Sequence, residues 1–160
     1  MSDRYNNIFG SGPTGVLTTV LLWVVALQIS TWVSIPEMHI APIFRWVLIL
    51  LFSIDAAVLL VWSHIILPPS VRAKTLITKG PYQFVRHPIY AAFIWSGTGI
   101  MAMTYKSWLL IVFVIPIHIF WAWHVQKEEK HMIDKFGSAY ADYIKTTGQF
   151  FPRFIVGKKN

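Results

Sequence analysis

The chain has 160 residues, of which 55% are hydrophobic and only 13% are charged, and its formal net charge is +7. Because an ordinary soluble domain is about a quarter charged, this composition excludes a typical soluble domain and predicts a single all-α membrane domain over residues 1–160. The absence of cysteine excludes disulfides, thiolate metal sites and a cysteine nucleophile. The positive charge does not point to nucleic acid, and we expect no nucleic-acid partner, since basic residues in a membrane chain report its orientation first.

Four apolar stretches predict a polytopic, multi-pass protein. A helix needs about 20 apolar residues to cross roughly 30 Å of hydrocarbon, and the stretches at 15–33, 44–67, 88–104 and 107–125 approach this length. The first is expected to be an uncleaved span, because it has neither a basic segment before it nor a small-residue cleavage site after it. The short connection "TYKS" predicts a tight antiparallel hairpin of the last two spans, and a charged helical segment is expected to continue beyond them.

The basic residues gather on one side of the predicted spans. Of the 14 lysines and arginines, all but Arg45 and Lys106 lie in the N-terminal segment, in the 68–87 loop or after the last span. By the positive-inside rule, both termini and the 68–87 loop are expected in the cytoplasm. An even number of spans agrees with termini on the same side.

Arg86 and His87 lie directly before Pro88, where the third span is expected to begin. Proline suits the first turn of a helix, and the free backbone N–H groups and positive dipole end at that point favour an anion such as a carboxylate. One interpretation is therefore an anion-binding site. The other is that Arg86 reaches a lipid phosphate and that His87 caps the helix.

A second ionisable cluster, Glu128 and Glu129, follows the fourth span. The third span rises about 25 Å at 1.5 Å per residue, so the returning helix regains the level of Pro88 near His124. The two glutamates should then lie level with the arginine and histidine, at the membrane boundary. Convergent ionisable groups beside an apolar cavity predict a functional site. The alternative is a solvated helix face on which the glutamates alternate with lysines.

In their order and spacing these motifs resemble the isoprenylcysteine carboxyl methyltransferase family and the related phospholipid methyltransferases. The similar segments are "GPYQFVRHPIY" at 80–90, the paired glutamates, and "FGSAYADYIKTTGQFFP" at 136–152, so the resemblance covers roughly residues 75–152. It implies an integral membrane enzyme that uses S-adenosylmethionine and releases S-adenosylhomocysteine. Ala92 stands where the family often has glycine. Sterol reductases are less similar, because Ile89 stands where their motif has asparagine.

The resemblance and the chemistry of such a donor imply roles for named side chains. Arg86 and Glu129 are expected to be catalytic. The expected cofactor-binding residues are Arg86, His87, Tyr90, Glu128, Glu129 and Tyr82. In this scheme Arg86 and His87 bind the donor's carboxylate, and the glutamates accept hydrogen bonds from its ribose hydroxyls or its ammonium. Aromatic rings stack on its adenine.

Other aromatic residues have two interpretations. Phe84, Trp121 and Trp123 either offer further faces to adenine or belong to an interfacial aromatic belt. The segment 136–152 is expected to fold over the cofactor as a partial lid, or else Tyr140 and Tyr143 anchor it to lipid.

The expected partners are a lipophilic small molecule or a lipid-modified substrate, and membrane lipid. An isoprenylcysteine-like carboxylate is the preferred methyl acceptor, and the amine of phosphatidylethanolamine is the alternative. A carboxylate is already ionised, whereas an amine must lose a proton to a base. His87, His124 and His131 could each serve, so the residues leave this choice open.

Further polar residues fall within the spans. Asp55 and His118 either line the acceptor's path or pair with each other or with neighbouring backbone. The small residues Ala92, Ser96 and Gly99 predict close helix packing.

Two other hypotheses follow from the residues. His124, Glu128 and His131 share a helix face with metal-ligand chemistry, but we find no convincing supplementary ligands and expect no metal site. A non-enzymatic membrane scaffold or small transporter is the other alternative.

Overall fold

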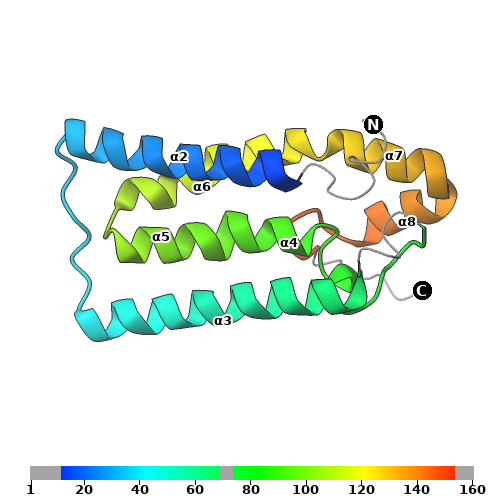
Figure 1. Ribbon diagram of the computed structural model, residues 1–160, viewed down its shortest axis with the longest axis horizontal. Coiled ribbons are helices and arrows are strands. Elements are labelled where there is room, and N and C mark those ends of the chain that lie inside the picture. Colours follow the sequence, from blue (N-terminus) through cyan, green and yellow to red (C-terminus); the bar gives the residue numbers. More distant parts are fainter. Residues whose placement is uncertain (1–11, 69–73, 154–160) are drawn as a thin grey trace, which may run out of the picture.

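The computed structural model describes residues 12–68 and 74–153 and is built almost entirely of helices (Figure 1). The only β-type pairing among these residues is an isolated bridge between Val85 and Gly148, so the all-α prediction is confirmed. Four of the basic residues used to predict orientation lie outside the described residues: Arg4, Arg72, Lys158 and Lys159.

Three helices in the described ranges are long and apolar enough to cross a membrane. They are α2 (Gly12–Trp32), α3 (Pro42–Ile66), and α6 (Trp108–His124) with its charged continuation α7 (Gln126–Phe136). The interior of α6 contains Pro116, and α3 begins with a proline in its first turn, where proline is tolerated. These helices cover the stretches predicted as spans at 15–33, 44–67 and 107–125.

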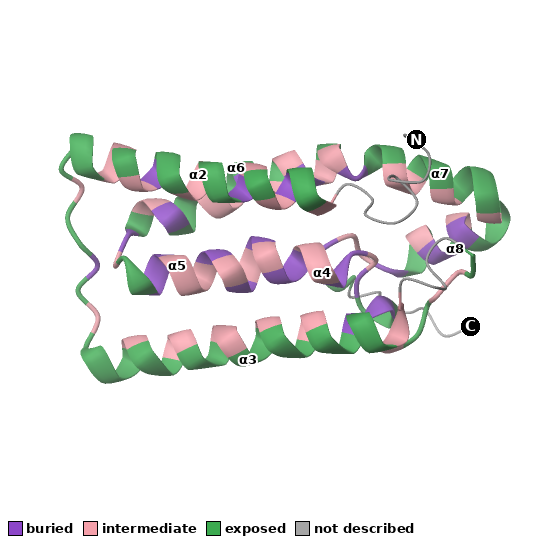
Figure 2. Ribbon diagram, viewed as in Figure 1, coloured by how far each residue is buried: buried purple, intermediate pink, exposed green. Residues whose placement is uncertain are grey.

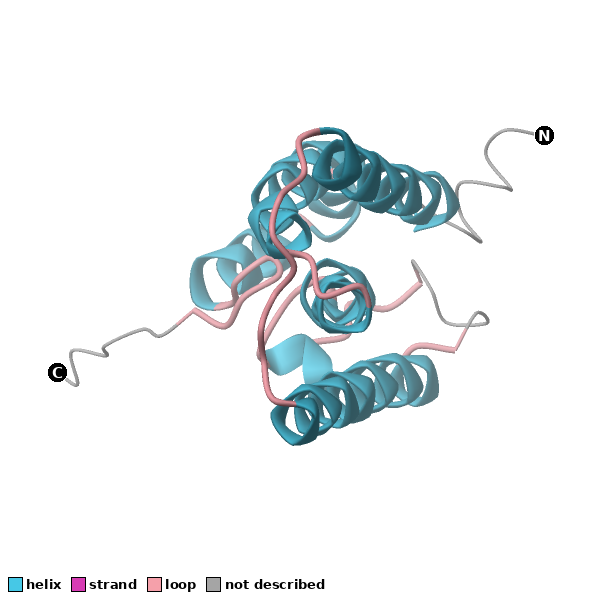
Figure 3. Cartoon of the chain, turned by 90° about the vertical axis from the view of Figure 1, so that its left-hand side faces the viewer, coloured by secondary structure: helices cyan, strands magenta, loops and turns pink. Residues whose placement is uncertain are grey.

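The third predicted span, 88–104, is also helical throughout, but it is not regular. It consists of α4 (Pro88–Ala91), a π-helical segment η2 (Ala92–Gly97) and α5 (Thr98–Thr104). Pro88 begins it, as predicted. This central rod packs against α3 on one side and against α6 and α2 on the other, and the end-on view shows one rod enclosed by the others (Figure 3). The π segment widens the helix at the centre of the bundle.

Small residues allow the helices to approach one another closely. A Cβ atom on Gly99 would lie 2.7 Å from the Phe52 ring, and one on Gly15 would lie 2.2 Å from the ring of Trp121. Ala92 and Ser96 are buried. The small-residue spacing in the third span therefore predicted its packing correctly.

The long helices expose most of their apolar side chains (Figure 2). In α3, only Ser63 is buried among 25 residues. A soluble protein does not present apolar surface on this scale, whereas hydrocarbon is a suitable solvent for it. The chain is therefore an integral membrane protein.

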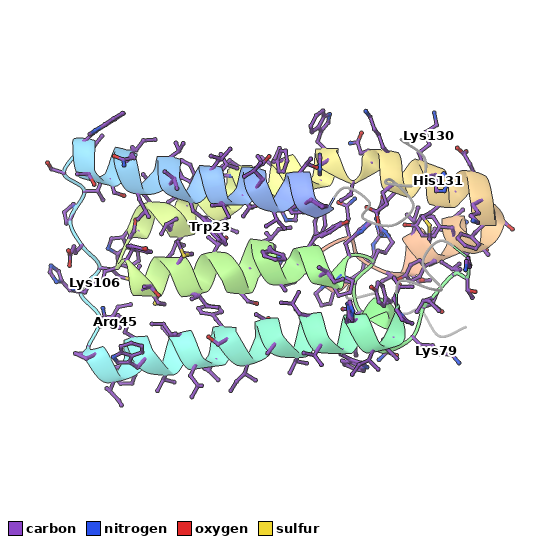
Figure 4. All side chains as sticks on the ribbon, in the orientation of Figure 1. Trp23, Arg45, Lys79, Lys106, Lys130 and His131 are labelled. Carbon is purple, nitrogen blue, oxygen red and sulfur yellow. The ribbon has the colours of Figure 1, made fainter. Side chains whose placement is uncertain are left out.

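One end of the bundle, here called the site end, carries η1 (Gly80–Gln83), α7 and α8 (Ser138–Thr146). Gly137 joins α7 to α8 with a φ of 57°, a left-handed conformation that suits glycine. After α8 the chain folds back along residues 85–87. Lys79, Lys130 and His131 lie at the site end, whereas Arg45 and Lys106 lie at the opposite end (Figure 4).

Candidate functional site

The segment that carries Arg86 and His87 lies between η1 and α4 and is held by the returning C-terminal segment. The backbone N–H of Arg86 donates to the Gly148 carbonyl at 2.8 Å, and that of His87 donates to the Gln149 carbonyl at 3.0 Å. Pro88 then starts the central rod. The backbone positions of Arg86 and His87 are therefore set by residues far away in the sequence. The backbone N–H groups of both residues are already paired within the protein.

Arg86, His87 and Glu129 converge on one carboxylate oxygen. Arg86 Nε donates to Glu129 Oε1 at 2.9 Å, and His87 Nε2 lies 3.1 Å from the same oxygen. Since a carboxylate oxygen accepts, His87 must carry a proton on Nε2. The three side chains are 7–14% exposed. The predicted meeting of the two hairpin ends is confirmed, and a solvated helix face is the wrong interpretation for Glu129.

The Arg86 guanidinium also caps the C-terminal end of α8. Its Nη1 donates to the carbonyls of Thr147 and, at 3.5 Å, Ile144. Carbonyls at a helix C-terminus have no partner within the helix, and the dipole makes that end negative. One cation thus joins the start of the central rod, the acid on α7 and the end of α8.

The surroundings of Glu129 keep it ionised. Burial by itself raises the pKa of this carboxyl, but the hydrogen bonds and charges of His87 and Arg86 outweigh burial and lower its pKa to about 2. A carboxylate that accepts strong hydrogen bonds loses its proton readily. Glu129 is therefore negative throughout the physiological pH range.

Glu128 has a different partner on the central rod. The hydroxyl of Tyr90 donates to Glu128 Oε2 at 3.2 Å. The adjacent acids thus have different partners: Glu129 contacts the arginine–histidine pair just before the central rod, and Glu128 contacts a tyrosine within it. The lysines beside them in the sequence, Lys127 and Lys130, are exposed.

Aromatic rings support Tyr90. Its ring stacks on His87, with centroids 5.4 Å apart, and on Trp121, with centroids 4.4 Å apart. Trp121 is fully buried, so it is a core residue and offers no open face to adenine, contrary to one of the sequence interpretations. Phe84 and Trp123 are exposed. Of the predicted aromatic residues, Tyr90 is thus the one in the charged cluster.

Tyr82 lies in η1, where it is buried against α8. The hydroxyl of Tyr143 donates to the Tyr82 backbone carbonyl. Tyr140 and Tyr143 are both buried, so the hypothesis that they anchor to lipid is wrong. Burial, with the nearby charge of Glu129, raises the pKa of both hydroxyls, which therefore stay neutral. No local pattern in the sequence distinguishes this buried pair of tyrosines from a pair at the membrane interface.

An apolar cavity of about 560 Å³, open to the surroundings on one side, adjoins the charged cluster. It lies between the N-terminal end of α2, the last turns of α3 and the start of the central rod. Leu60, Val61 and Ile65 line it together with His64 and Tyr90. Tyr90 therefore borders the cavity while its hydroxyl contacts Glu128.

Two polar residues of the predicted spans, Asp55 and His118, have separate partners. Ser96 in the π segment donates a hydrogen bond to Asp55 of α3. His118 packs its ring against Trp95 and Phe150, each with a centroid separation of 5.5 Å. The two residues are thus engaged with different neighbours, and the pairing of Asp55 with His118 is wrong.

The helix face considered for a metal is divided among other contacts. His124 Nε2 lies 3.0 Å from the Thr14 hydroxyl, Glu128 accepts from Tyr90, and His131 is exposed. Within residues 12–68 and 74–153, no three potential metal-ligating side chains of this kind gather at one point.

Comparison with known proteins gives a family match over most of the candidate functional site. The model of the isoprenylcysteine carboxyl methyltransferase (ICMT) family matches residues 34–134, which includes both the Arg86–His87 pair and the two glutamates. The match begins after α2.

Several curated proteins are similar over the same part of the chain. The protein-S-isoprenylcysteine O-methyltransferase of Saccharomyces cerevisiae is 28% identical over 91 residues, which is 57% of this chain and 38% of that protein. The protein of the same name from Schizosaccharomyces pombe is 32% identical over 93 residues, 57% of this chain and 39% of its own length. The cobalt-zinc-cadmium resistance protein CzcN of Cupriavidus metallidurans is 30% identical over 80 residues, 50% of this chain and 37% of its own. The matched part is less than two fifths of the length of each of these relatives.

Proposed function

Because the chain belongs to the isoprenylcysteine carboxyl methyltransferase family, we propose that it methylates a lipophilic acceptor with S-adenosylmethionine as donor. The preferred acceptor is an isoprenylcysteine-like carboxylate, which would become a methyl ester. The observation that carries this proposal is the buried Arg86–His87–Glu129 cluster beside an apolar cavity, with Tyr90 at their boundary.

The side chains in the cluster fit the chemical groups of the proposed donor. Its carboxylate requires hydrogen-bond donors, and its ammonium and ribose hydroxyls require acceptors. Arg86 and His87 supply the first, and Glu128 and Glu129 supply the second. The described contacts of Arg86 use Nε and Nη1, which leaves Nη2 for a ligand carboxylate. When bound, S-adenosylmethionine would supply an electrophilic methyl carbon on its sulfonium.

The protein's own contribution to catalysis would be positioning and exclusion of water. Arg86 and Glu129 fix the charged end of the site because each is held by partners on other elements. The apolar cavity would hold the hydrocarbon part of the acceptor and keep water away from the reacting carboxylate. A carboxylate acceptor needs no general base, which agrees with a cluster whose central acid is committed to an ion pair.

N-methylation of phosphatidylethanolamine is the second candidate function. One observation favours it: the imidazole of His64 lines the apolar cavity, where it could serve as the general base that an amine acceptor requires. A carboxylate acceptor is already ionised, so it would not need His64 as a base.

We also propose that the site end faces the cytoplasm. This proposal is supported by the distribution of basic residues, since Lys79 and Lys130 lie at the site end while Arg45 and Lys106 lie opposite. The polar donor would then arrive from the cytosol and the acceptor from the bilayer.

Two measurements on the purified, detergent-solubilised chain test the proposal. Calorimetric titration with S-adenosylhomocysteine should show saturable binding, and its absence for the folded protein would defeat the proposed reaction. Labelled donor supplied with a farnesylated cysteine analogue should then give a product that releases labelled methanol in base. A base-stable product on phosphatidylethanolamine would instead establish N-methylation.

A further inference from the structure

Helix α2 lies outside the part of the chain that the family model matches, yet it packs against α6 beside the candidate site. Gly15 brings α2 against α6 so closely that a Cβ atom would lie 2.2 Å from the Trp121 ring. α2 and α6 also run side by side in both views (Figures 1 and 3). The family match therefore assigns no role to α2, although this helix contacts the Trp121 ring that stacks on Tyr90.

A buried hydrogen bond joins the two helices one turn further along α2. The indole N–H of Trp121 donates to the Thr19 hydroxyl at 2.8 Å, and that hydroxyl donates in turn to the Gly15 carbonyl at 2.9 Å. Both side chains are fully buried. In such a dry environment an indole N–H without an acceptor is costly, so this bond strongly restricts where the indole lies.

The restricted indole is the support on which Tyr90 rests. The ring of Tyr90 stacks on Trp121 at 4.4 Å with an interplanar angle of 25°, and on His87 at 5.4 Å with an angle of 10°. The Tyr90 hydroxyl donates to Glu128, and His87 contacts Glu129. A continuous series of contacts thus runs from Thr19 on α2 to both glutamates of the site.

We propose that Thr19 is a positioning residue of the donor site, acting through Trp121 on Tyr90. This inference rests on the proposed methyltransferase function and extends it to a helix outside the family match. The Tyr90–Glu128 hydrogen bond is 3.2 Å long. This is longer than the usual O–H···O distance of about 2.5–3.0 Å, so a further displacement of a few tenths of an ångström breaks it. Loss of the Thr19 hydroxyl allows such a displacement, because the indole must turn to find another acceptor.

Three single variants of the full chain test the role of Thr19 by calorimetric titration with S-adenosylhomocysteine. Thr19→Val keeps the side-chain volume but removes the acceptor, and should raise Kd about fivefold to tenfold. Thr19→Ser restores the hydroxyl and should bind within about twofold of wild type. Thr18→Val is the matched control, since the Thr18 hydroxyl donates only to the Thr14 carbonyl of its own helix in the described contacts, and it should leave Kd unchanged.

A double-variant cycle distinguishes positioning from a purely structural role. In a Tyr90→Phe background the hydroxyl that transmits the effect is gone, so Thr19→Val should change Kd by less than about twofold. Thr19→Val that binds like wild type while folded, or that weakens binding equally in both backgrounds, would overturn the proposal. If wild type itself does not bind, the proposed function has failed, and this inference fails with it.

Should Thr19→Val not fold, Trp121→Phe provides the second route. It removes the indole donor and leaves no unpaired N–H, while it keeps an aromatic ring against Tyr90. It should raise Kd by a similar factor, and Thr19→Ala added to it should cause no further change in Kd. A further tenfold loss on adding Thr19→Ala would overturn the proposal, because Thr19 would then act without the indole.

Discussion

Two ion pairs at opposite ends of the bundle have nearly equal lengths and very different surroundings. Arg86 and Glu129 are 2.9 Å apart with side chains 9% and 14% exposed, whereas Lys106 and Glu37 are 3.0 Å apart with side chains 43% and 66% exposed. Water screens the second pair, and such exposed pairs contribute about 0–1 kcal/mol to stability. The first pair has lost most of its water and depends on protein partners, so removal of one member leaves an uncompensated charge. The burial of the side chains, rather than the N–O distance, therefore distinguishes the ion pair of the site from the ion pair on the surface.

The largest effect is expected from Arg86→Ala. The variant leaves the Glu129 carboxylate buried without its cation and leaves the Thr147 carbonyl without its donor. We expect the free energy of unfolding to fall by about 3 kcal/mol or more, and binding of S-adenosylhomocysteine to be lost. Thermal denaturation in detergent and calorimetry measure the two effects.

Arg153→Ala is the matched control for that substitution. Arg153 also donates to the Ile144 carbonyl, at 3.2 Å, and to the Lys145 carbonyl, but it is exposed. Its loss should change the free energy of unfolding by about 0.5 kcal/mol or less. Equal destabilisation by both arginine variants would show that burial of the charge is not the decisive difference.

Acid should affect the buried pair over a defined pH range. The pKa of Glu129 is lowered from 4.5 to about 2, so the stability that this ionised group contributes is fully present above pH 4.5 and is lost as the pH falls towards 2. The melting temperature should therefore decline through this interval in wild type, and less steeply in Glu129→Gln. Identical acid profiles for the two proteins would contradict the assignment.

A smaller effect is expected from Tyr90→Phe, which keeps the ring on Trp121 and His87 but removes the hydroxyl that contacts Glu128. The free energy of unfolding should fall by about 1 kcal/mol, while Kd for S-adenosylhomocysteine should rise about tenfold. Tyr105→Phe, at an exposed tyrosine of the opposite end, is the control and should leave both quantities unchanged. Unchanged binding in Tyr90→Phe would exclude Tyr90 from the donor site.

The smallest effect is expected from Glu37→Gln, which breaks the exposed pair with Lys106. The free energy of unfolding should change by less than about 1 kcal/mol, and the difference from wild type should shrink as salt is added. Methyl transfer should be unchanged. A destabilisation as large as that of Arg86→Ala would refute the contrast between the two ends.

The charged half of the site was predictable because it depends on local rules. Proline marks the first turn of a helix, and the rise of a helix per residue is constant, so Glu129 could be placed level with Arg86 by counting along a hairpin. The confirmed contact at 2.9 Å follows from that count.

The aromatic half could not be predicted, as Trp121 and Trp123 illustrate. They lie two residues apart on one apolar helix, yet the first is fully buried and the second is 65% exposed. In a bilayer, lipid is as apolar as a protein interior, so the hydrophobic pattern does not reveal which face of a helix meets protein. The same reason concealed the contact of Thr19 with Trp121.

The amino-acid sequence by itself determined the membrane environment, the extent of the helices and the depth at which the charged groups meet, because composition, hydrophobic length and helical rise are properties of the local chain. Only the tertiary structure decided which faces of those helices are buried, that α8 ends on Arg86, and that α2 supports the site through Trp121. Those features depend on contacts between residues 61 and 102 positions apart, and their geometry is set by close packing rather than by local preference.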